Sequence, residues 1–230
     1  MPSNPVIYVL ALFLFSVKLI GEKRDIDTIP SGFVYLRDID STILEELRYF
    51  RSDNFIGSTI DGYDSASLVL SRSAAVALSQ VQADLKRANK GLKIFDAYRP
   101  QKAVDHFVLW AQDPLDTLMK SEFYPNIPKN ELFKRGYIAT RSGHTRGSTV
   151  DLTIVDLHTH KELDMGGPFD FFGVQSHHDH GQLTTEQRSN RAFLKSIMIK
   201  HGFRPYAKEW WHYTLNAEPY PNTYFDFNIK

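Results

Sequence analysis

The sequence predicts one α+β domain in which helices pack on a mainly antiparallel sheet. Segments with helical periodicity and short β-rich segments follow one another without the regular strand–helix alternation that a parallel sheet requires. No repeat, low-complexity tract or linker divides residues 29–230, and a chain of 230 residues is long enough for one large domain. Residues 1–28 contain an apolar leader and are set apart from this domain.

Helices are expected at three places where periodicity and end signals agree. Over residues 71–90, apolar residues recur at steps of three and four, and Gly91 is expected to end the helix. Pro100 suits the first position of the next helix. Thr184 and Gln187 have the capping-box spacing that opens a further helix.

An additional helix and three strands complete the expected domain. Thr42 and Glu45 also have the capping-box spacing, which predicts a first helix. Residues 92–97 are short and apolar, as in a buried strand, and residues 151–155 are β-rich and predict a central strand. Residues 210–215 alternate bulky side chains and predict a final strand.

The composition excludes several classes of function. Lys+Arg and Asp+Glu both number 27, so the chain has no basic surplus for binding nucleic acid or an anionic membrane. It contains no cysteine, which removes disulfides, thiolate metal sites and cysteine nucleophiles. Any bound metal must therefore be held by carboxylate oxygens and by the nitrogens of the nine histidines.

Residues 6–17 form an apolar run in which Ser16 is the one polar residue. Twelve residues are too few to span a bilayer core, which needs about 20, but they suit the apolar region of an export signal. No basic residue precedes the run, and no clear cleavage site follows it. We expect an exported or membrane-tethered protein; the alternative is a cytoplasmic protein whose N-terminal helix or strand is buried.

The segment SGHTRGSTVD places His144 and Asp151 on two sides of a glycine-containing turn. Such a turn can bring an imidazole beside the carboxylate at the start of the next strand, and zinc accepts both ligand types. Taken alone, the pair is more commonly a loop histidine and a structural aspartate. A metal site also needs a third ligand from elsewhere in the chain.

The segment EWWH contains the candidate third ligand, His212, and a second acidic residue, Glu209. Residues three apart on a regular strand point to opposite faces, so a local bend is needed for both to reach one cleft. In a zinc hydrolase, three side chains hold the metal and an unligated carboxylate takes a proton from water. The alternative is a half-buried, tryptophan-rich strand whose polar residues pair with ordinary neighbours.

The segment DAYRP places Asp96 and Arg99 where a strand ends and a helix begins. An arginine held there by a carboxylate could offer a fixed fork of donors to an oxygen that gains negative charge during amide hydrolysis. A structural ion pair that closes the turn explains the same residues equally well.

Taken together and in order, these three segments resemble the D-alanyl-D-alanine dipeptidases, zinc peptidases that include the enzyme of vancomycin resistance. Further segments resemble the same family, so that the resemblance covers roughly residues 33–230. They are residues 47–49, 54–57, 124–127, 165–170, 218–222 and 224–227.

The resemblance implies hydrolysis of the dipeptide D-Ala-D-Ala to two D-alanines, in the metabolism of peptidoglycan precursors or wall peptides, with one Zn²⁺ per chain. It gives a role to each matched residue. The implied zinc ligands are His144, Asp151 and His212, the catalytic residues are Glu209 as base and Arg99 as transition-state stabiliser, and the substrate-binding residues are Tyr49, Asp96, Ser142 and Asp170.

Tyr49 and Asp170 are expected to meet the free ammonium group of the substrate, which favours a dipeptide over an acylated peptide. The alternatives are a related zinc D,D-carboxypeptidase acting on longer wall peptides, or an inactive zinc- or wall-binding module.

Thr149 departs from the family, which usually has alanine there. The sequence implies no stable protein partner, and it leaves open a homo-oligomer and a second metal at residues 177–180.

Overall fold

The structure is a computed structural model that describes Met1 and residues 29–230, so the apolar run predicted as a leader lies outside the described residues. The helices of the described part are α1 (Leu36–Ile39), α2 (Arg72–Lys86), α3 (Gln101–Gln112), α4 (Lys120–Phe123), α5 (Leu132–Arg135) and α6 (Thr185–Lys200). Short 3₁₀ turns are η1 (Arg48–Phe50), η2 (Lys129–Glu131), η3 (His144–Arg146) and η4 (Val174–Ser176). Among the described residues, no helix combines the length and apolar character needed to cross a membrane.

Two sheets organise the domain, and the larger one carries the site. The strands are β1 (Phe33–Tyr35), β2 (Leu44–Glu45), β3 (Val69–Ser71), β4 (Lys90–Asp96), β5 (Thr149–Asp156), β6 (Phe203–Tyr206) and β7 (Glu209–Leu215). β1 and β3 form a two-stranded sheet, and the five-stranded sheet has the order β2-β4-β5-β7-β6. Only the short β2 runs parallel to its neighbour; the other pairings are antiparallel. The predicted α+β class with a mainly antiparallel sheet is confirmed.

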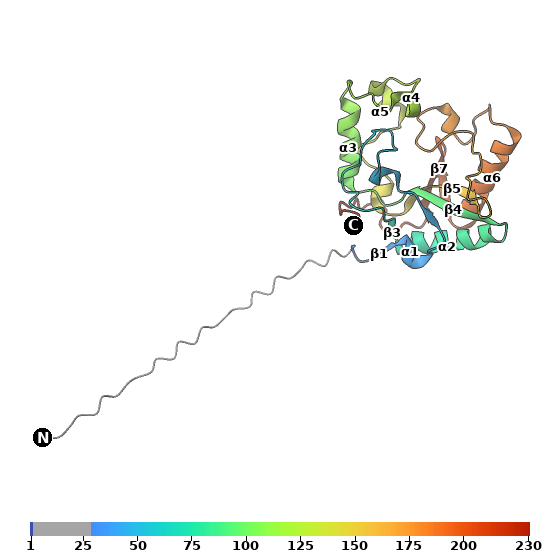
Figure 1. Ribbon diagram of the computed structural model, residues 1–230. Helices are drawn as coiled ribbons and strands as arrows, with labels where there is room; N and C mark the ends of the chain where they lie inside the picture. The colour runs from blue at the N-terminus through green and yellow to red at the C-terminus, as the bar shows by residue number, and fades with distance from the viewer. Residues whose placement is uncertain (2–28) are drawn as a thin grey trace.

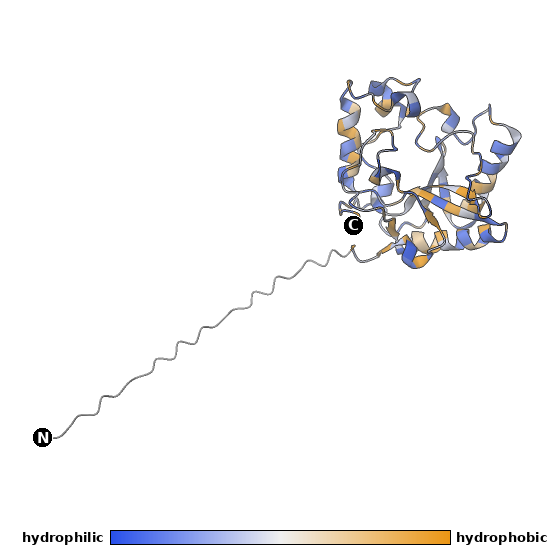
Figure 2. Ribbon diagram, in the orientation of Figure 1, coloured by the Kyte–Doolittle hydropathy of each residue, from blue (hydrophilic) through white to orange (hydrophobic). Residues whose placement is uncertain are grey.

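Two of the longer helices pack on the five-stranded sheet. α2 packs against β4, and α6 packs against β6 and β7. α3, α4 and α5 lie together on another side of the molecule (Figure 1). Hydrophobic residues recur along β4, whereas much of α6 is hydrophilic (Figure 2). Seven of the eight residues of β5 are buried, so both faces of this central strand are covered.

Two of the predicted helices begin as the sequence indicates. α3 begins at Gln101, one position later than predicted, and Pro100 is its N-cap. Thr184 caps α6 through a capping box in which its hydroxyl accepts a hydrogen bond from the backbone of Gln187 and the Gln187 side chain accepts one from Thr184. The predicted helix over residues 71–90 is shorter, because Asn89 adopts a left-handed φ of 54° and Lys90 already belongs to β4.

The helix predicted from Thr42 and Glu45 is wrong. The Thr42 hydroxyl donates to Asp40 Oδ1 and so does not cap a helix. Leu44 and Glu45 instead form β2 and pair with β4. Pairing with a central strand here outweighs the local helix signal, as tertiary contacts commonly do.

Candidate active site

Three neighbouring strands place three polar residues in one row. Asp151 of β5 pairs with Asp96 of β4 on one side and with His212 of β7 on the other. Residues that are paired across adjacent strands project to the same face of a sheet. A β-bulge in β4 beside Asp96 adjusts the local register. Segments that are far apart in sequence therefore deliver two carboxylates and an imidazole to one place.

His144 reaches the same place from the turn before β5. Gly147 makes this turn possible, because its φ is 79° and a Cβ there would lie 2.3 Å from the Phe33 ring. The His144 Nδ1 lies 2.7 Å from the carbonyl oxygen of Ala97, which acts as the hydrogen-bond acceptor. This bond places the proton on Nδ1 and leaves the lone pair of Nε2 directed toward Asp151.

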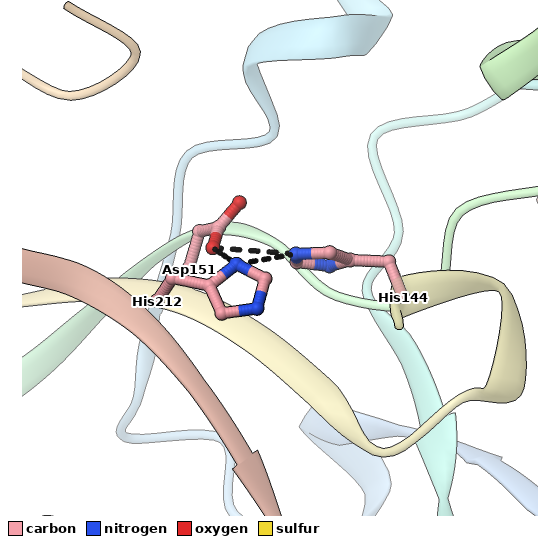
Figure 3. A group of neighbouring side chains, drawn as sticks. All are labelled: His144, Asp151 and His212. Carbon is pink, nitrogen blue, oxygen red and sulfur yellow. Dashed lines mark hydrogen bonds and ion pairs between the residues drawn. The ribbon is translucent and has the colours of Figure 1, made fainter. Parts of the chain in front are cut away.

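The side chains of His144, Asp151 and His212 converge on one point (Figure 3). Asp151 Oδ1 lies 3.3 Å from His144 Nε2 and 3.1 Å from His212 Nδ1, and the two nitrogens are 3.2 Å apart. In a tetrahedral site with bonds of about 2.0–2.1 Å, ligand atoms lie about 3.3 Å apart. Asp151 Oδ1 is also buried without a satisfying hydrogen bond. The three residues therefore fit a divalent metal ion.

The charges around this group also favour a cation. Burial by itself would raise the pKa of Asp151, but His144 and His212 hold it well below its ordinary value, so the carboxylate is ionised. Burial lowers the pKa of His144, and the nearby Asp151 opposes this shift in part. Burial would also lower the pKa of His212, but the carboxylates of Asp151 and Glu209 raise it. Two negative groups thus act on this imidazole in the absence of a metal.

An irregularity in β7 brings Glu209 to the metal-binding group. Glu209 pairs with Tyr206 of β6, whereas the next pair joins Tyr213 to Pro205, so residues 210–212 have no partner on β6. These unpaired residues form the local bend that the sequence analysis required for Glu209 and His212 to reach one cleft. Burial raises the pKa of Glu209 to about 7. Glu209 is therefore a carboxyl beside the metal-binding atoms that titrates near neutral pH.

Arg99 is held in place by Asp96 at the other side of the site. Its Nε and Nη2 donate to Asp96 Oδ2 at 2.9 and 2.8 Å, and Nη2 lies 3.5 Å from Asp151 Oδ2. Asp96 is fully buried and its second oxygen accepts a hydrogen bond from Tyr63 at 2.8 Å. The guanidinium also lies over the Tyr49 ring, with its Cζ 4.9 Å from the ring centroid. Asp96 thus orients Arg99 and does not itself line the cavity.

Tyr49 and Asp170 form a buried pair on a further wall. The Tyr49 hydroxyl donates to Asp170 Oδ2 at 2.7 Å, although the two residues are 121 positions apart. Asp170 has a φ of 60°, a backbone conformation that is uncommon for residues other than glycine. Burial, and next the negative charge of Asp151, raises the pKa of Asp170 well above its ordinary value. A cationic ligand group beside Asp170 would lower its pKa again and favour the ionised carboxylate.

A cavity of about 290 Å³ joins these groups. This volume is at the low end of the range of about 300–1,000 Å³ for ligand pockets and suits a small ligand. The predicted residues that line the cavity are Tyr49, Arg99, Ser142, His144, Asp151, Asp170, Glu209 and His212.

A family model described as D-ala-D-ala dipeptidase matches residues 30–230. The chain belongs to the D-Ala-D-Ala dipeptidase family. It is therefore a peptidase of a metal-dependent family, and the cavity described above lies within the matched region.

Curated relatives of this chain carry the name D-alanyl-D-alanine dipeptidase. One from Streptomyces coelicolor is 45% identical, over 86% of this chain and 98% of the relative. One from Enterococcus faecalis is 41% identical, over 87% of this chain and 99% of the relative. A third, from Escherichia coli, is 33% identical over 76% and 81% of the two chains. A solved LD-carboxypeptidase structure has 15% identity and a TM-score of 0.41, over 84% of this chain and 72% of its own.

Ser142 and Thr149 show how this member of the dipeptidase family builds the turn. The Ser142 side chain accepts a hydrogen bond from the backbone N–H of His144 at 3.2 Å. Thr149 Oγ1 lies 2.9 Å from Thr214 Oγ1, its partner across β5 and β7. The Thr149 hydroxyl, which the sequence analysis treated as a departure from the family, is therefore hydrogen-bonded inside the sheet.

Sequence reasoning missed several residues that shape the cavity. Residues 136–139, Arg141, Phe172 and Tyr206 contribute to its walls, and no local motif marks most of them. Among the described residues, His144, Asp151 and His212 are the one group close enough to share a metal. The patch at residues 177–180 does not form a second such group in this part of the chain.

Proposed function

We propose that this protein hydrolyses the free dipeptide D-Ala-D-Ala to two D-alanines with a zinc ion held by His144, Asp151 and His212. The observation that carries the proposal is the placement of Glu209. It lies beside the three metal-binding atoms in the same cavity, with its Oε2 3.3 Å from His212 Nδ1. A metal site with an adjacent unligated carboxylate is an arrangement that supports metal-assisted hydrolysis of an amide.

Zinc suits the donor set, because two imidazole nitrogens and one carboxylate oxygen are ligands that it accepts in catalytic sites. The chemistry that zinc supplies when held in this way is polarisation of the scissile carbonyl and a lowered pKa of the attacking water. All three side chains also line the cavity, from which a further ligand could reach a bound metal.

Glu209 acts as the general base and later as the acid. Its carboxylate accepts the proton of the attacking water and then returns a proton to the leaving amine. Burial raises the pKa of Glu209 to about 7 in the metal-free protein, and a nearby divalent cation lowers it. The carboxyl is then ionised at neutral pH, and a pKa not far from the working pH favours transfer in both directions.

Arg99 stabilises the negative charge that develops on the carbonyl oxygen. Two hydrogen bonds to Asp96 and the contact with the Tyr49 ring fix its position before the substrate binds. A donor that is already oriented requires little reorganisation in the transition state. Asp96 is a positioning residue in this scheme.

Tyr49 and Asp170 bind the substrate ammonium group. In the ligand-free cavity, the raised pKa of Asp170 reflects the cost of ionising a buried carboxyl. An ammonium group beside it repays this cost, whereas an acylated nitrogen does not. The pair therefore favours a free dipeptide over a longer peptide.

The test is an assay that compares D-Ala-D-Ala with N-acetyl-D-Ala-D-Ala, with and without a chelator. We expect hydrolysis of the free dipeptide, little hydrolysis of the acetylated one, and loss of activity on chelation that added zinc restores. A preference for the acetylated substrate would instead indicate a carboxypeptidase, and no hydrolysis of either would support a binding module.

We further propose that the protein is exported or tethered to a membrane. The support is the apolar run of residues 6–17, which has the length of the apolar region of an export signal. N-terminal sequencing of the mature protein tests this. A shortened N-terminus in an exported fraction is expected, and an intact protein confined to the cytoplasm would contradict it.

A further inference from the structure

The cavity contains two arginines, and they differ in how their charges are compensated. Arg99 is paired with Asp96 and lies near Asp151. Arg141 also lines the cavity but is exposed. No ion pair joins it to a carboxylate of the described residues. Arg141 is thus the cavity cation that remains available to a ligand.

The contact that Arg141 does make leaves its hydrogen-bond donors accessible. Its Cζ lies 5.0 Å from the centroid of the Tyr224 ring. A guanidinium placed over an aromatic face uses its own flat face for that contact. The N–H groups along its edge then remain free, and this edge is the part that binds a carboxylate with two parallel hydrogen bonds.

The position of Arg141 in the chain places it beside the reacting groups. It precedes Ser142 and lies three residues before His144, and all three line one cavity. The acidic residues of the cavity are Asp151, Asp170 and Glu209, and the proposed function occupies them with the metal, the ammonium group and proton transfer. None of them can receive the carboxylate of a dipeptide.

We propose that Arg141 binds the terminal carboxylate of the substrate, with Tyr224 holding its guanidinium in place. This inference rests on the proposed function and extends it to the second end of the dipeptide. A zwitterionic dipeptide that enters a small cavity loses hydration at both charged ends, so each end needs a partner. Arg141 supplies the partner that Tyr49 and Asp170 cannot.

The consequence is a cavity that recognises both ends of its substrate. The pair of Tyr49 and Asp170 requires a free amine, and Arg141 requires a free carboxylate. Peptides extended at either end lose one of these interactions. The specificity for dipeptides then comes from two separate charge pairs, and each can be removed by itself.

The experiment compares D-Ala-D-Ala with its C-terminal amide in the wild type and in Arg141→Met, at saturating zinc. The amide retains the scissile bond and the ammonium group but lacks the charge that Arg141 binds. For the wild type we expect kcat/KM to be about 10- to 100-fold higher on the acid, the range for a hydrogen-bonded charge pair. In Arg141→Met, kcat/KM on the acid falls by that factor, while the amide changes by less than about threefold.

Two further variants and a binding measurement complete the test. Tyr224→Ala should lower kcat/KM on the acid by a smaller factor and leave kcat/KM on the amide unchanged. Arg135→Met is the control, because Arg135 is paired with Glu131 and does not line the cavity. It should leave kcat/KM on both compounds unchanged. Calorimetry with the Glu209→Gln protein gives the affinities for acid and amide without turnover. The inference would be overturned if Arg141→Met lowered kcat/KM equally on the acid and the amide, or did not lower it on the acid. If the wild type hydrolyses neither compound and binds neither, the proposed function itself fails.

Discussion

Glu209 Oε2 lies 3.3 Å from His212 Nδ1, although the two residues are three positions apart in one strand. On a regular strand their side chains would point to opposite faces. The contact exists because residues 210–212 have no partners on β6. Irregularities of this kind re-aim side chains next to active sites. Here the irregularity places a buried carboxyl beside a metal-binding imidazole, and this arrangement has consequences for stability and for catalysis.

The first prediction concerns the stability of the metal-free protein. The pKa of Glu209 is about 7 in the fold against an ordinary value of 4.5, and its side chain is 17% exposed. Because the folded state holds this proton more tightly, the free energy of unfolding of the wild type falls as the pH rises from about 4.5 to about 7, by on the order of 2–3 kcal/mol. Glu209→Gln removes this contribution.

Urea unfolding at pH 5 and pH 8 in the presence of a chelator measures the effect. At pH 8 we expect Glu209→Gln to be more stable than the wild type, and at pH 5 the difference should be much smaller. Glu122→Gln, a change on the exposed part of α4, serves as the control. An identical pH dependence in Glu209→Gln and the wild type would show that Glu209 is not desolvated in the fold.

The second prediction concerns Arg191 of α6, which is buried and holds the loop that contains Asp170. Its Nε, Nη1 and Nη2 donate to the carbonyl oxygens of Met165, His177 and Gln175 at 2.5, 2.6 and 2.7 Å. Arg191→Met should raise KM for D-Ala-D-Ala about tenfold, with a smaller change in kcat, because the loop that presents Asp170 loses its support.

A comparison of the free dipeptide with its N-acetyl form distinguishes a positioning role of Arg191 from a purely structural one. If Arg191 positions Asp170, Arg191→Met also reduces the preference for the free dipeptide over its N-acetyl form. Arg188→Met is a matched control on the same helix, because Arg188 makes longer bonds, of 3.5 and 3.4 Å, to Gly181 and Leu183. An unchanged preference together with a lower melting temperature would assign Arg191 to stability alone.

The third prediction concerns Thr149, whose hydroxyl pairs with that of Thr214 across β5 and β7. Thr149→Ala removes the hydrogen bond to Thr214 and should lower the free energy of unfolding by about 1 kcal/mol. Metal content and kcat should stay at wild-type values, since no metal-binding side chain contacts this hydroxyl. Denaturant unfolding and a metal assay test both parts. A loss of metal would show that the threonine pair supports the turn directly.

The sequence predicted which residues come together as a possible metal site better than it predicted the bounds of the surrounding helices. His144 and Asp151 flank a short turn, so their proximity follows from local geometry. The third member, His212, could be joined to them through the resemblance to the family, because its register with Asp151 is a long-range feature. The bend that Glu209 needs was identified as a requirement, but its position depends on β6, which the sequence pattern did not indicate.

The errors and omissions have the same physical origin. Thr42 has a local capping pattern, yet pairing of the next residues with β4 decides their structure. Arg191 looks like an exposed position of an amphipathic helix until the loop carbonyls are placed around it. Contacts that depend on distant segments leave no periodic signal in a single sequence.

The central claim is that His144, Asp151 and His212 hold the metal while Glu209 moves protons, and zinc content measured together with turnover tests it most directly. In Glu209→Ala we expect one zinc per chain and a kcat on D-Ala-D-Ala that is lower by about 10²–10⁴-fold. In His212→Ala we expect zinc and activity to be lost together. Wild-type turnover in Glu209→Ala, or retention of zinc in His212→Ala, would contradict the account.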